Sequence, residues 1–375
     1  MNTVGVIGAG QLARMMQPPA IALGLNLKVF AEARDASASL SSTQFGDYTN
    51  FDQLLEFAQS VDVITFDHEH VPVELLEKLE SLGHRVRPGP KALIHAQNKL
   101  VMRRRLAELG LPQPVWQAAT AVEEVDNFIL ANGPEVVVKT PIGGYDGKGV
   151  RVISSSAEVS DWLERISDFG GELLLEQKVP YVRELAQLIA RRPQGETGSW
   201  DTVETRQVNG VCSEVISPAS GVDYATVRGI ARAIAVGLDV VGVMAVELFE
   251  LANGEVMVNE LAMRPHNSGH FSIEGSKTSQ FEQHLRAVLD LPLGSTQAIA
   301  KSAVMVNLLG VDEKNDFVSR FRSAMSKFPG VKFHTYQKSP RLGRKMGHVS
   351  VIGDDAEALL EQARGAQRAL LSTIA

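Results

Sequence analysis

Lys139-Thr140-Pro141-Ile142-Gly143-Gly144-Tyr145-Asp146-Gly147-Lys148-Gly149 is the stretch that decides the fold. It lies between two apolar runs that we expect to be strands, Glu135 to Lys139 and Val150 to Ser154. Glycines expose successive backbone N–H groups, and Lys139 and Lys148 offset negative charge, so the loop predicts a lid over a triphosphate. It is not a P-loop, because no Gly-Lys-Ser/Thr run follows. The alternative is an ordinary hairpin loop without a ligand.

A second hairpin is expected downstream, where Gly242 to Leu251 and Glu255 to Glu260 flank the turn signal Asn253-Gly254. A two-residue turn places Glu247 opposite Glu260. Facing carboxylates repel each other, whereas a divalent cation between them reverses the sign of the interaction. We therefore expect Glu247, Glu260 and the neighbouring amide of Asn259 to hold Mg²⁺, with Mn²⁺ also possible. The alternatives are a solvated hairpin, or a loop one residue longer that offsets the two acids.

Residues 1–90 alternate short apolar strands with helical stretches, which is typical of a parallel βαβ sheet. The expected elements are Val4 to Ile7, Leu12 to Leu23, Leu27 to Phe30, Phe51 to Ala58 and Val61 to Phe66. The turn Gly8-Ala9-Gly10-Gln11-Leu12-Ala13 follows the first strand, and Glu32 ends the second. This pattern is compatible with a dinucleotide site, with a tight turn that binds nothing, or with a turn that holds a small phosphorylated substrate.

The rest of the chain divides into two further regions. One helix is expected from about Lys91 to Leu109, which places Arg103 to Arg105 on a helix surface. Strands then recur up to the acidic hairpin, and a C-terminal region begins near Lys301 with β-like runs followed by a helix. The expected domains are an N-terminal Rossmann-like domain (1–95), a large central domain (96–300, with a lid at about 115–180) and a small β-rich C-terminal domain (301–375). The fold class is multidomain α/β and α+β.

Composition restricts the kind of partner. The 375 residues carry a net charge of -7, which disfavours nucleic acid and anionic lipid as partners. One cysteine excludes an intramolecular disulfide, and no apolar run approaches the roughly 20 residues that span a membrane. The first ten residues have the pattern of a strand rather than a signal peptide. We expect a cytoplasmic protein that binds small molecules.

The order of motifs resembles the ATP-grasp ligases: a lysine before a Gly-rich lid, a Glu176-Gln177-Lys178-Val179 strand, and a hairpin ending in Asn259-Glu260. Within that superfamily the chain resembles the N5-carboxyaminoimidazole ribonucleotide synthetases nearly end to end. Besides the two glycine loops, the motifs that carry this resemblance are Arg264-Pro265-His266-Asn267-Ser268-Gly269-His270 and Gly343-Arg344-Lys345-Met346-Gly347-His348. The resemblance implies an ATP-grasp fold with a preceding Rossmann-like domain.

It also implies a reaction, in which bicarbonate is joined to the amine of 5-aminoimidazole ribonucleotide through carboxyphosphate, and ATP gives ADP and phosphate. The family suggests a homodimer. The residues implied around ATP are Lys99, Lys139, Gly144, Tyr145, Asp146, Gly147, Lys148, Gly149, Glu176, Gln177, Lys178, Val179, Glu184, Glu204, Asn259 and Glu260. Those implied for catalysis are Arg264, His266, Asn267 and Lys338. Those implied around the ribonucleotide are Gln11, Leu12, Glu69, Tyr145, Arg264, Lys338, Arg341, Arg344 and Lys345.

Several alternatives remain open on the sequence. Another ATP-grasp ligase, of the formate-dependent glycinamide ribonucleotide transformylase or biotin carboxylase type, fits the same lid and hairpin. An NAD-dependent oxidoreductase would use the first glycine turn, and a non-catalytic regulator would bind ATP without turnover. The basic cluster from Lys338 to Lys345 is otherwise a solvated charge run. Asp67, His68 and His70 are expected to be loop polarity rather than metal ligands. Glu204 stands where a histidine can occur in the family, and Arg191 to Ser199 has no counterpart there.

Overall fold

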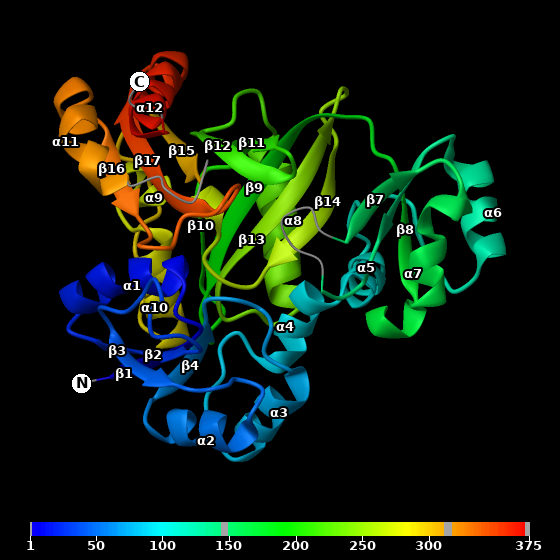
Figure 1. Cartoon of the computed structure of the whole chain (residues 1–375), viewed down its shortest axis with the longest axis horizontal. Helices are drawn as coiled ribbons and strands as arrows, with labels where there is room; N and C mark the ends of the chain where they lie inside the picture. Colours follow the sequence, from blue (N-terminus) through cyan, green and yellow to red (C-terminus); the bar gives the residue numbers. More distant parts are fainter. Residues whose placement is uncertain (1, 144–148, 311–316, 372–375) are drawn as a thin grey trace.

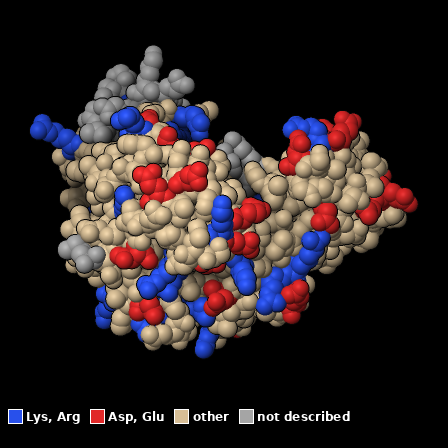
Figure 2. All heavy atoms as spheres, turned by 90° about the horizontal axis from the view of Figure 1, so that it is seen from below, with Lys and Arg blue, Asp and Glu red and all other residues tan. Residues whose placement is uncertain are grey.

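The computed structural model describes residues 2–143, 149–310 and 317–371. The strands form three sheets (Figure 1). Over the described ranges, no helix is long and apolar enough to cross a membrane. Positive and negative side chains are interspersed on the face seen in Figure 2, with no broad area of one sign among the residues coloured there.

The N-terminal sheet is parallel, in the order β3-β2-β1-β4, as the βαβ pattern predicts. Its strands are β1 (Thr3–Ile7), β2 (Asn26–Ala31), β3 (Ser42–Phe45) and β4 (Val63–Phe66). The helices of this region are α1 (Gln11–Ala22), α2 (Phe51–Gln59) and α3 (Val73–Ser81). β3 was not predicted, because its four residues are mostly polar and partly exposed at the sheet edge.

The single helix expected from Lys91 to Leu109 is wrong. There are two helices, α4 (Pro90–Gln97) and α5 (Lys99–Glu108), with Asn98 in an extended conformation between them. The Asn98 side chain accepts hydrogen bonds from the N–H groups of Leu100 and Val101, which compensates for the interrupted helix. The break places Lys99 in the first turn of α5. Its N–H donates to the carbonyl of Pro141 (2.9 Å), at the base of the Gly-rich loop.

The region expected to form the lid contains a separate four-stranded antiparallel sheet in the order β5-β8-β6-β7, on the right of Figure 1. The expected pair of strands around the Gly-rich loop is confirmed as β6 and β7. The strands are β5 (Trp116–Ala119), β6 (Val136–Lys139), β7 (Val150–Ile153) and β8 (Leu173–Gln177), and the α-helices are α6 (Val122–Asn132) and α7 (Ser160–Glu164).

The central sheet has nine strands, in the order β14-β13-β9-β11-β12-β15-β17-β16, with β10 paired to β9. The segment Arg191 to Ser199 forms the β9–β10 hairpin. The strands before residue 300 are β9 (Tyr181–Arg191), β10 (Thr197–Ser199), β11 (Val203–Val208), β12 (Val211–Ser217), β13 (Gly242–Leu251) and β14 (Val256–Ala262). The α-helices here are α8 (Tyr224–Gly237), α9 (Ser272–Gly275) and α10 (Gln280–Val288).

The C-terminal strands continue this sheet, because β15 pairs with β12. An apolar cluster between these strands and the last helix gives the region a core of its own. The elements are β15 (Ser302–Leu309), α11 (Phe317–Lys327), β16 (Lys332–Thr335), β17 (Lys345–Gly353) and α12 (Ala356–Leu371). The expected strands and final helix are confirmed, whereas α11 and the pairing with the central sheet were not predicted.

His284 on α10 joins the N-terminal and central sheets. Its Nδ1 accepts from the N–H of Val243 on β13 (3.0 Å), so the neutral ring carries its proton on Nε2, which lies 2.7 Å from the hydroxyl of Thr65 on β4. The side chain is fully buried, and burial lowers the pKa of His284 to about 3. The link therefore requires the neutral ring.

A pH dependence of stability follows. The unfolded chain binds a proton at His284 below roughly pH 6.5, and the folded chain does not until about pH 3. This stabilisation is complete above pH 6.5 and is lost as the pH falls toward 3. In urea titrations between these values, we expect His284→Gln to reduce the slope of the unfolding free energy by about 1.4 kcal/mol per pH unit. His84→Gln, in the loop after α3, is the control, and equal slopes in the wild type and His284→Gln would contradict the prediction.

Candidate active site

The acidic hairpin pairs Glu247 with Glu260, as predicted. The predicted two-residue turn is wrong, however, because Leu251 donates to the carbonyl of Glu255 and the register near the turn pairs Glu250 with Val256. A β-bulge restores the pairing: Leu248 faces Val258 while Glu247 faces Glu260, so that Asn259 is the extra residue. The longer turn and the bulge compensate each other, and the two carboxylates meet.

The electrostatics of this pair favour a cation. Burial, followed by the charges of Glu260 and Glu184, raises the pKa of Glu247 to about 8. In the described part of the chain, no group of three His, Cys, Asp or Glu side chains could hold a metal ion by itself. Two carboxylates and an amide oxygen nevertheless fit Mg²⁺, which commonly binds one or two carboxylates and completes its coordination with substrate phosphates and water.

Two lysines converge on the same hairpin from other elements. Lys139, at the end of β6, lies 2.7 Å from a carboxylate oxygen of Glu176 on β8 and donates to the Asn259 side chain (3.2 Å). Lys99, at the start of α5, lies 3.7 Å from Glu260. Both lysines are more than nine-tenths buried, so their charge acts in a medium that screens it less than water does. The structure thus places two cationic groups beside the predicted metal ligands.

The prediction that Arg103 lies on a helix surface is wrong, because its side chain is fully buried. It donates to Glu176 from Nε (2.6 Å). Burial alone would raise the pKa of Glu176, but Lys139 and Arg103 outweigh burial and hold the pKa at about 2. The sequence contains an indication that Arg103 is buried. Arg103 follows Lys99 by four residues and precedes Leu106 by three, so all three lie on the same face of α5, which is buried. Arg104 and Arg105 do lie toward solvent.

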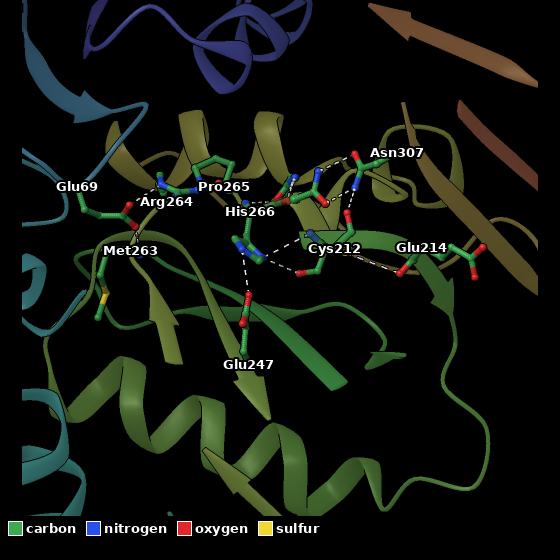
Figure 3. A network of polar contacts seen from close by, with 12 residues as sticks. Glu69, Cys212, Glu214, Glu247, Met263, Arg264, Pro265, His266 and Asn307 are labelled. Atoms are coloured by element: carbon green, nitrogen blue, oxygen red, sulfur yellow. Dashed lines mark hydrogen bonds and ion pairs between the residues drawn. The ribbon is translucent and has the colours of Figure 1, made fainter. Parts of the chain in front are cut away.

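The loop after β14 brings Arg264 and His266 into the site (Figure 3). Glu69, from the loop after β4, accepts from Arg264 Nε (2.6 Å) and from the N–H of Met263 (3.0 Å). Burial, then the charges of Arg264 and Lys345, hold the pKa of His266 well below its usual range, so the ring is neutral. Nδ1 lies 2.9 Å from the hydroxyl of Ser268 and 3.4 Å from its backbone nitrogen, and Nε2 lies 3.2 Å from a carboxylate oxygen of Glu247.

Asn267 on the same loop is buried and pairs with Asn307 of β15 through both amide groups (3.1 and 2.7 Å). Asn307 also donates to the carbonyl of Cys212 on β12 (2.8 Å), as Figure 3 shows. The predicted catalytic loop is therefore anchored to the strands that join the central and C-terminal regions.

The first glycine turn is filled by the chain itself. Asp67, at the end of β4, accepts from the N–H groups of Gly10 (3.0 Å) and Ala13 (2.8 Å). A Cβ added at Gly10 would lie 2.1 Å from the Asp67 carboxylate, so glycine is required there by this approach. A carboxylate thus takes the position at the start of α1 that the pyrophosphate of a dinucleotide needs. This geometry argues against the oxidoreductase alternative and explains Asp67 as a helix cap.

The basic cluster reaches the same turn from the C-terminal region. Lys338 hydrogen-bonds to the side chain of Gln11, and Arg14 donates to Gln337 (2.6 Å). Lys345 is close enough for its charge to lower the pKa of His266. Arg344 is partly buried and donates to the Ser339 carbonyl (3.1 Å), whereas Arg341 is exposed. Leu12 is buried in the apolar core, so only its backbone is available to a ligand.

The remaining predicted ATP residues lie at the end of β8 and just after it, on β9 and β11 of the central sheet, and in the Gly-rich loop. Glu184 on β9 is close enough to raise the pKa of Glu247. Glu204 is engaged by Arg183 (3.4 Å) and Arg206 (2.9 Å), one on each carboxylate oxygen. Gln177 ends β8, Val179 is partly buried, and Lys178 pairs with Glu135 (2.5 Å). Gly149 is described, and its carbonyl accepts from Thr140 (2.9 Å), whereas Gly144, Tyr145, Asp146, Gly147 and Lys148 lie outside the described residues.

Comparison with known proteins places this geometry in a family. Residues 1–97 match the ribonucleotide synthetase preATP-grasp domain, residues 104–281 the ATP-grasp domain, and residues 303–362 the phosphoribosylaminoimidazole carboxylase C-terminal domain. The N5-carboxyaminoimidazole ribonucleotide synthase of Corynebacterium ammoniagenes is 47% identical, over 97% of this chain and 91% of its own length. The chain belongs to the N5-carboxyaminoimidazole ribonucleotide synthetase family. It is an ATP-dependent ligase with the ATP-grasp fold, as the order of motifs predicted.

Solved members of this synthetase family have the same fold. An ADP complex of one such synthetase is 32% identical, with a TM-score of 0.88, over 97% of this chain and 96% of that one. The Aspergillus clavatus synthase in complex with ADP and 5-aminoimidazole ribonucleotide is 28% identical, with a TM-score of 0.88, over 98% of both chains. The Rossmann-like domain, the ATP-grasp domain and the C-terminal domain are therefore all present in this chain.

Proposed function

We propose that this chain carboxylates 5-aminoimidazole ribonucleotide with bicarbonate, giving N5-carboxyaminoimidazole ribonucleotide while ATP is converted to ADP and phosphate. The observation that carries the proposal is the convergence, on the Glu247–Glu260 pair, of the lysines Lys99 and Lys139 and the Arg264–His266 loop. The proposed reaction has two steps. In the first step, a bicarbonate oxygen attacks the γ-phosphorus of ATP to give carboxyphosphate and ADP. The substrate amine then attacks the carboxyl carbon, phosphate leaves, and the nitrogen loses a proton.

The chain's residues mainly position groups and neutralise charge in this reaction. Lys139 and Lys99 face the nucleotide phosphates, and residues 176–179, Glu184 and Glu204 surround the base and ribose. The Gly-rich loop 144–149 is proposed to bind the phosphates as well, and its residues 144–148 lie outside the described residues. Glu247, Glu260 and Asn259 would hold Mg²⁺, which offsets charge on the transferring phosphoryl group when it is bound. Arg264, held by Glu69, orients bicarbonate, His266 fixes the Glu247 carboxylate, and Asn267 anchors the loop.

We place the ribonucleotide phosphate between the first glycine turn and the basic cluster. The contact of Lys338 with Gln11 supports this position, because it brings a cation to the start of α1 from a distant part of the sequence. The further groups proposed to bind the ribonucleotide are Leu12, Glu69, Tyr145, Arg264, Arg341, Arg344 and Lys345, of which Tyr145 lies outside the described residues.

A substrate-dependence assay tests the proposal. ADP release should require both 5-aminoimidazole ribonucleotide and bicarbonate. Glycinamide ribonucleotide with formate, or biotin with bicarbonate, should not support it, and these substrate pairs test the other ATP-grasp activities. ADP formation that does not depend on the aminoimidazole ribonucleotide would contradict the acceptor assignment. ATP binding without turnover in the complete mixture would favour the non-catalytic regulator.

Lys338→Met tests the phosphate position. Because a charge-assisted hydrogen bond contributes about 1.5 to 3 kcal/mol, we expect the KM for aminoimidazole ribonucleotide to rise at least about tenfold. The KM values for ATP and bicarbonate should change little. Lys332→Met, an exposed lysine on β16, is the matched control. An unchanged KM for the ribonucleotide would show that the phosphate binds elsewhere.

The proposal includes the setting of the enzyme. We propose that it acts in the cytoplasm as a homodimer, with Mg²⁺ or Mn²⁺ as the ion. Light scattering would then give twice the 40.6 kDa mass of the chain. A mass of 40.6 kDa at working concentration would contradict the dimer.

A further inference from the structure

Arg103 on α5 is the charged residue that is most completely enclosed by the predicted site. Its exposed fraction is 0%, and α5 lies between the lid and the central sheet (Figure 1). Nε donates to Glu176 (2.6 Å), Nη1 to the carbonyl of Val258 (2.7 Å) and Nη2 to the carbonyl of Asn259 (2.8 Å). A single guanidinium therefore contacts a strand of the lid and two consecutive residues of the acidic hairpin.

The two carbonyls that Arg103 binds belong to the β-bulge. In a regular strand, consecutive carbonyl groups point to opposite edges, so one side chain does not bind both. At the bulge, Val258 and Asn259 both direct their carbonyls toward Arg103, on the side of the edge strand β14 that faces away from β13. On the same side, the N–H of Val258 donates to the carbonyl of Pro112 (2.8 Å). The planar fork of a guanidinium matches two neighbouring acceptors, which an ammonium group does not. Arg103 thus stabilises the local geometry that departs from the regular ladder.

The bulge decides which side chains form the acidic pair. Without an extra residue at Asn259, the register that leaves the turn would place Asn259 opposite Glu247 and turn Glu260 to the other face of the sheet. Through Glu176, the same guanidinium also supports Lys139, which contacts Glu176 at 2.7 Å. One residue therefore sets the position of a predicted metal ligand and of a predicted phosphate-binding lysine.

We infer that Arg103 is a positioning residue that couples metal binding to nucleotide binding, by holding the bulge at Asn259 and the Glu176–Lys139 pair in one arrangement. The inference rests on the proposed function, because it takes Glu247 and Glu260 as the metal ligands. Arg103 acts through these groups and not through direct contact with substrate.

Arg103→Lys is the test, because it keeps the positive charge and removes the fork. ADP affinity is measured by calorimetry with Mg²⁺ and with EDTA, and the ratio of the two affinities reports the coupling. We expect this ratio to fall about tenfold or more, as for other residues that orient metal ligands. Arg104→Lys is the matched control, because Arg104 is half-exposed and pairs with Glu172 on the surface; its ratio should stay within about twofold of the wild type.

The possible outcomes separate the two claims. If the wild type binds ADP equally with and without Mg²⁺, the metal assignment in the proposed function fails. If the wild type shows coupling and a folded Arg103→Lys keeps it, only the inference about Arg103 is overturned. A purely structural role would lower the melting temperature and both affinities without changing their ratio. Arg103→Gln, which is neutral and donates to one carbonyl, replaces Arg103→Lys if that variant does not fold. Failure of both to fold would also overturn the inference.

Discussion

Glu260→Gln is expected to lower turnover about a hundredfold or more at limiting Mg²⁺, because several kcal/mol of charge stabilisation depend on the ion and each 1.36 kcal/mol is a factor of ten in rate. The fold should be preserved. The Glu260 side chain is 44% exposed, and its removal relieves the repulsion that raises the pKa of Glu247. The melting temperature should therefore stay constant or rise while activity falls, and steady-state rates over a magnesium titration measure the effect.

Glu255→Gln is the matched control for Glu260→Gln. It changes an exposed acid on the same hairpin, at the turn, whose carboxylate contacts only the neighbouring Asn253 in the contacts that the structure describes. Glu255→Gln should retain the wild-type rate at every magnesium concentration. Full activity of Glu260→Gln at limiting Mg²⁺ would refute the assignment of Glu260 as a metal ligand.

Lys139→Met is expected to lower kcat by about a hundredfold to a thousandfold, as the loss of one electrostatic contact to a transition state commonly does. The lysine is 9% exposed, and its charge has few solvent molecules to screen it. Folding should survive, because Arg103 still neutralises the Glu176 carboxylate (2.6 Å). Single-turnover measurement of ADP formation separates this chemical step from binding.

Lys277→Met serves as the control for Lys139→Met, since Lys277 is exposed and its side chain contacts Gln297 (2.7 Å), which is not one of the predicted site residues. A decrease in ATP affinity with unchanged kcat would show that Lys139 binds the ground state and the transition state equally well. An unchanged kcat and KM would contradict any contact of Lys139 with the phosphates.

Local sequence patterns predicted the elements of the site better than their connections. The acidic pair was predicted from a turn that the structure does not contain, because the bulge at Asn259 compensates for the longer turn. A bulge is stable only where another group binds its displaced carbonyls. Here that group is Arg103, which lies on a helix more than 150 residues earlier in the sequence, so the local sequence of the hairpin could not predict the bulge. The break between α4 and α5 at Asn98, by contrast, could have been predicted from the sequence, because asparagine is a preferred N-cap residue.

The sequence by itself determined the parallel sheet at the N-terminus, the strands around the glycine lid and the family, because these depend on hydrophobic periodicity and on motifs of neighbouring residues. The tertiary structure alone decided that Asp67 fills the first glycine turn, that Lys338 meets Gln11, and that Arg103 is buried beneath the acidic hairpin. Those contacts join segments far apart in the chain. Burial and charge in the folded chain select the partners of these residues, and the spacing of residues along the sequence does not predict them.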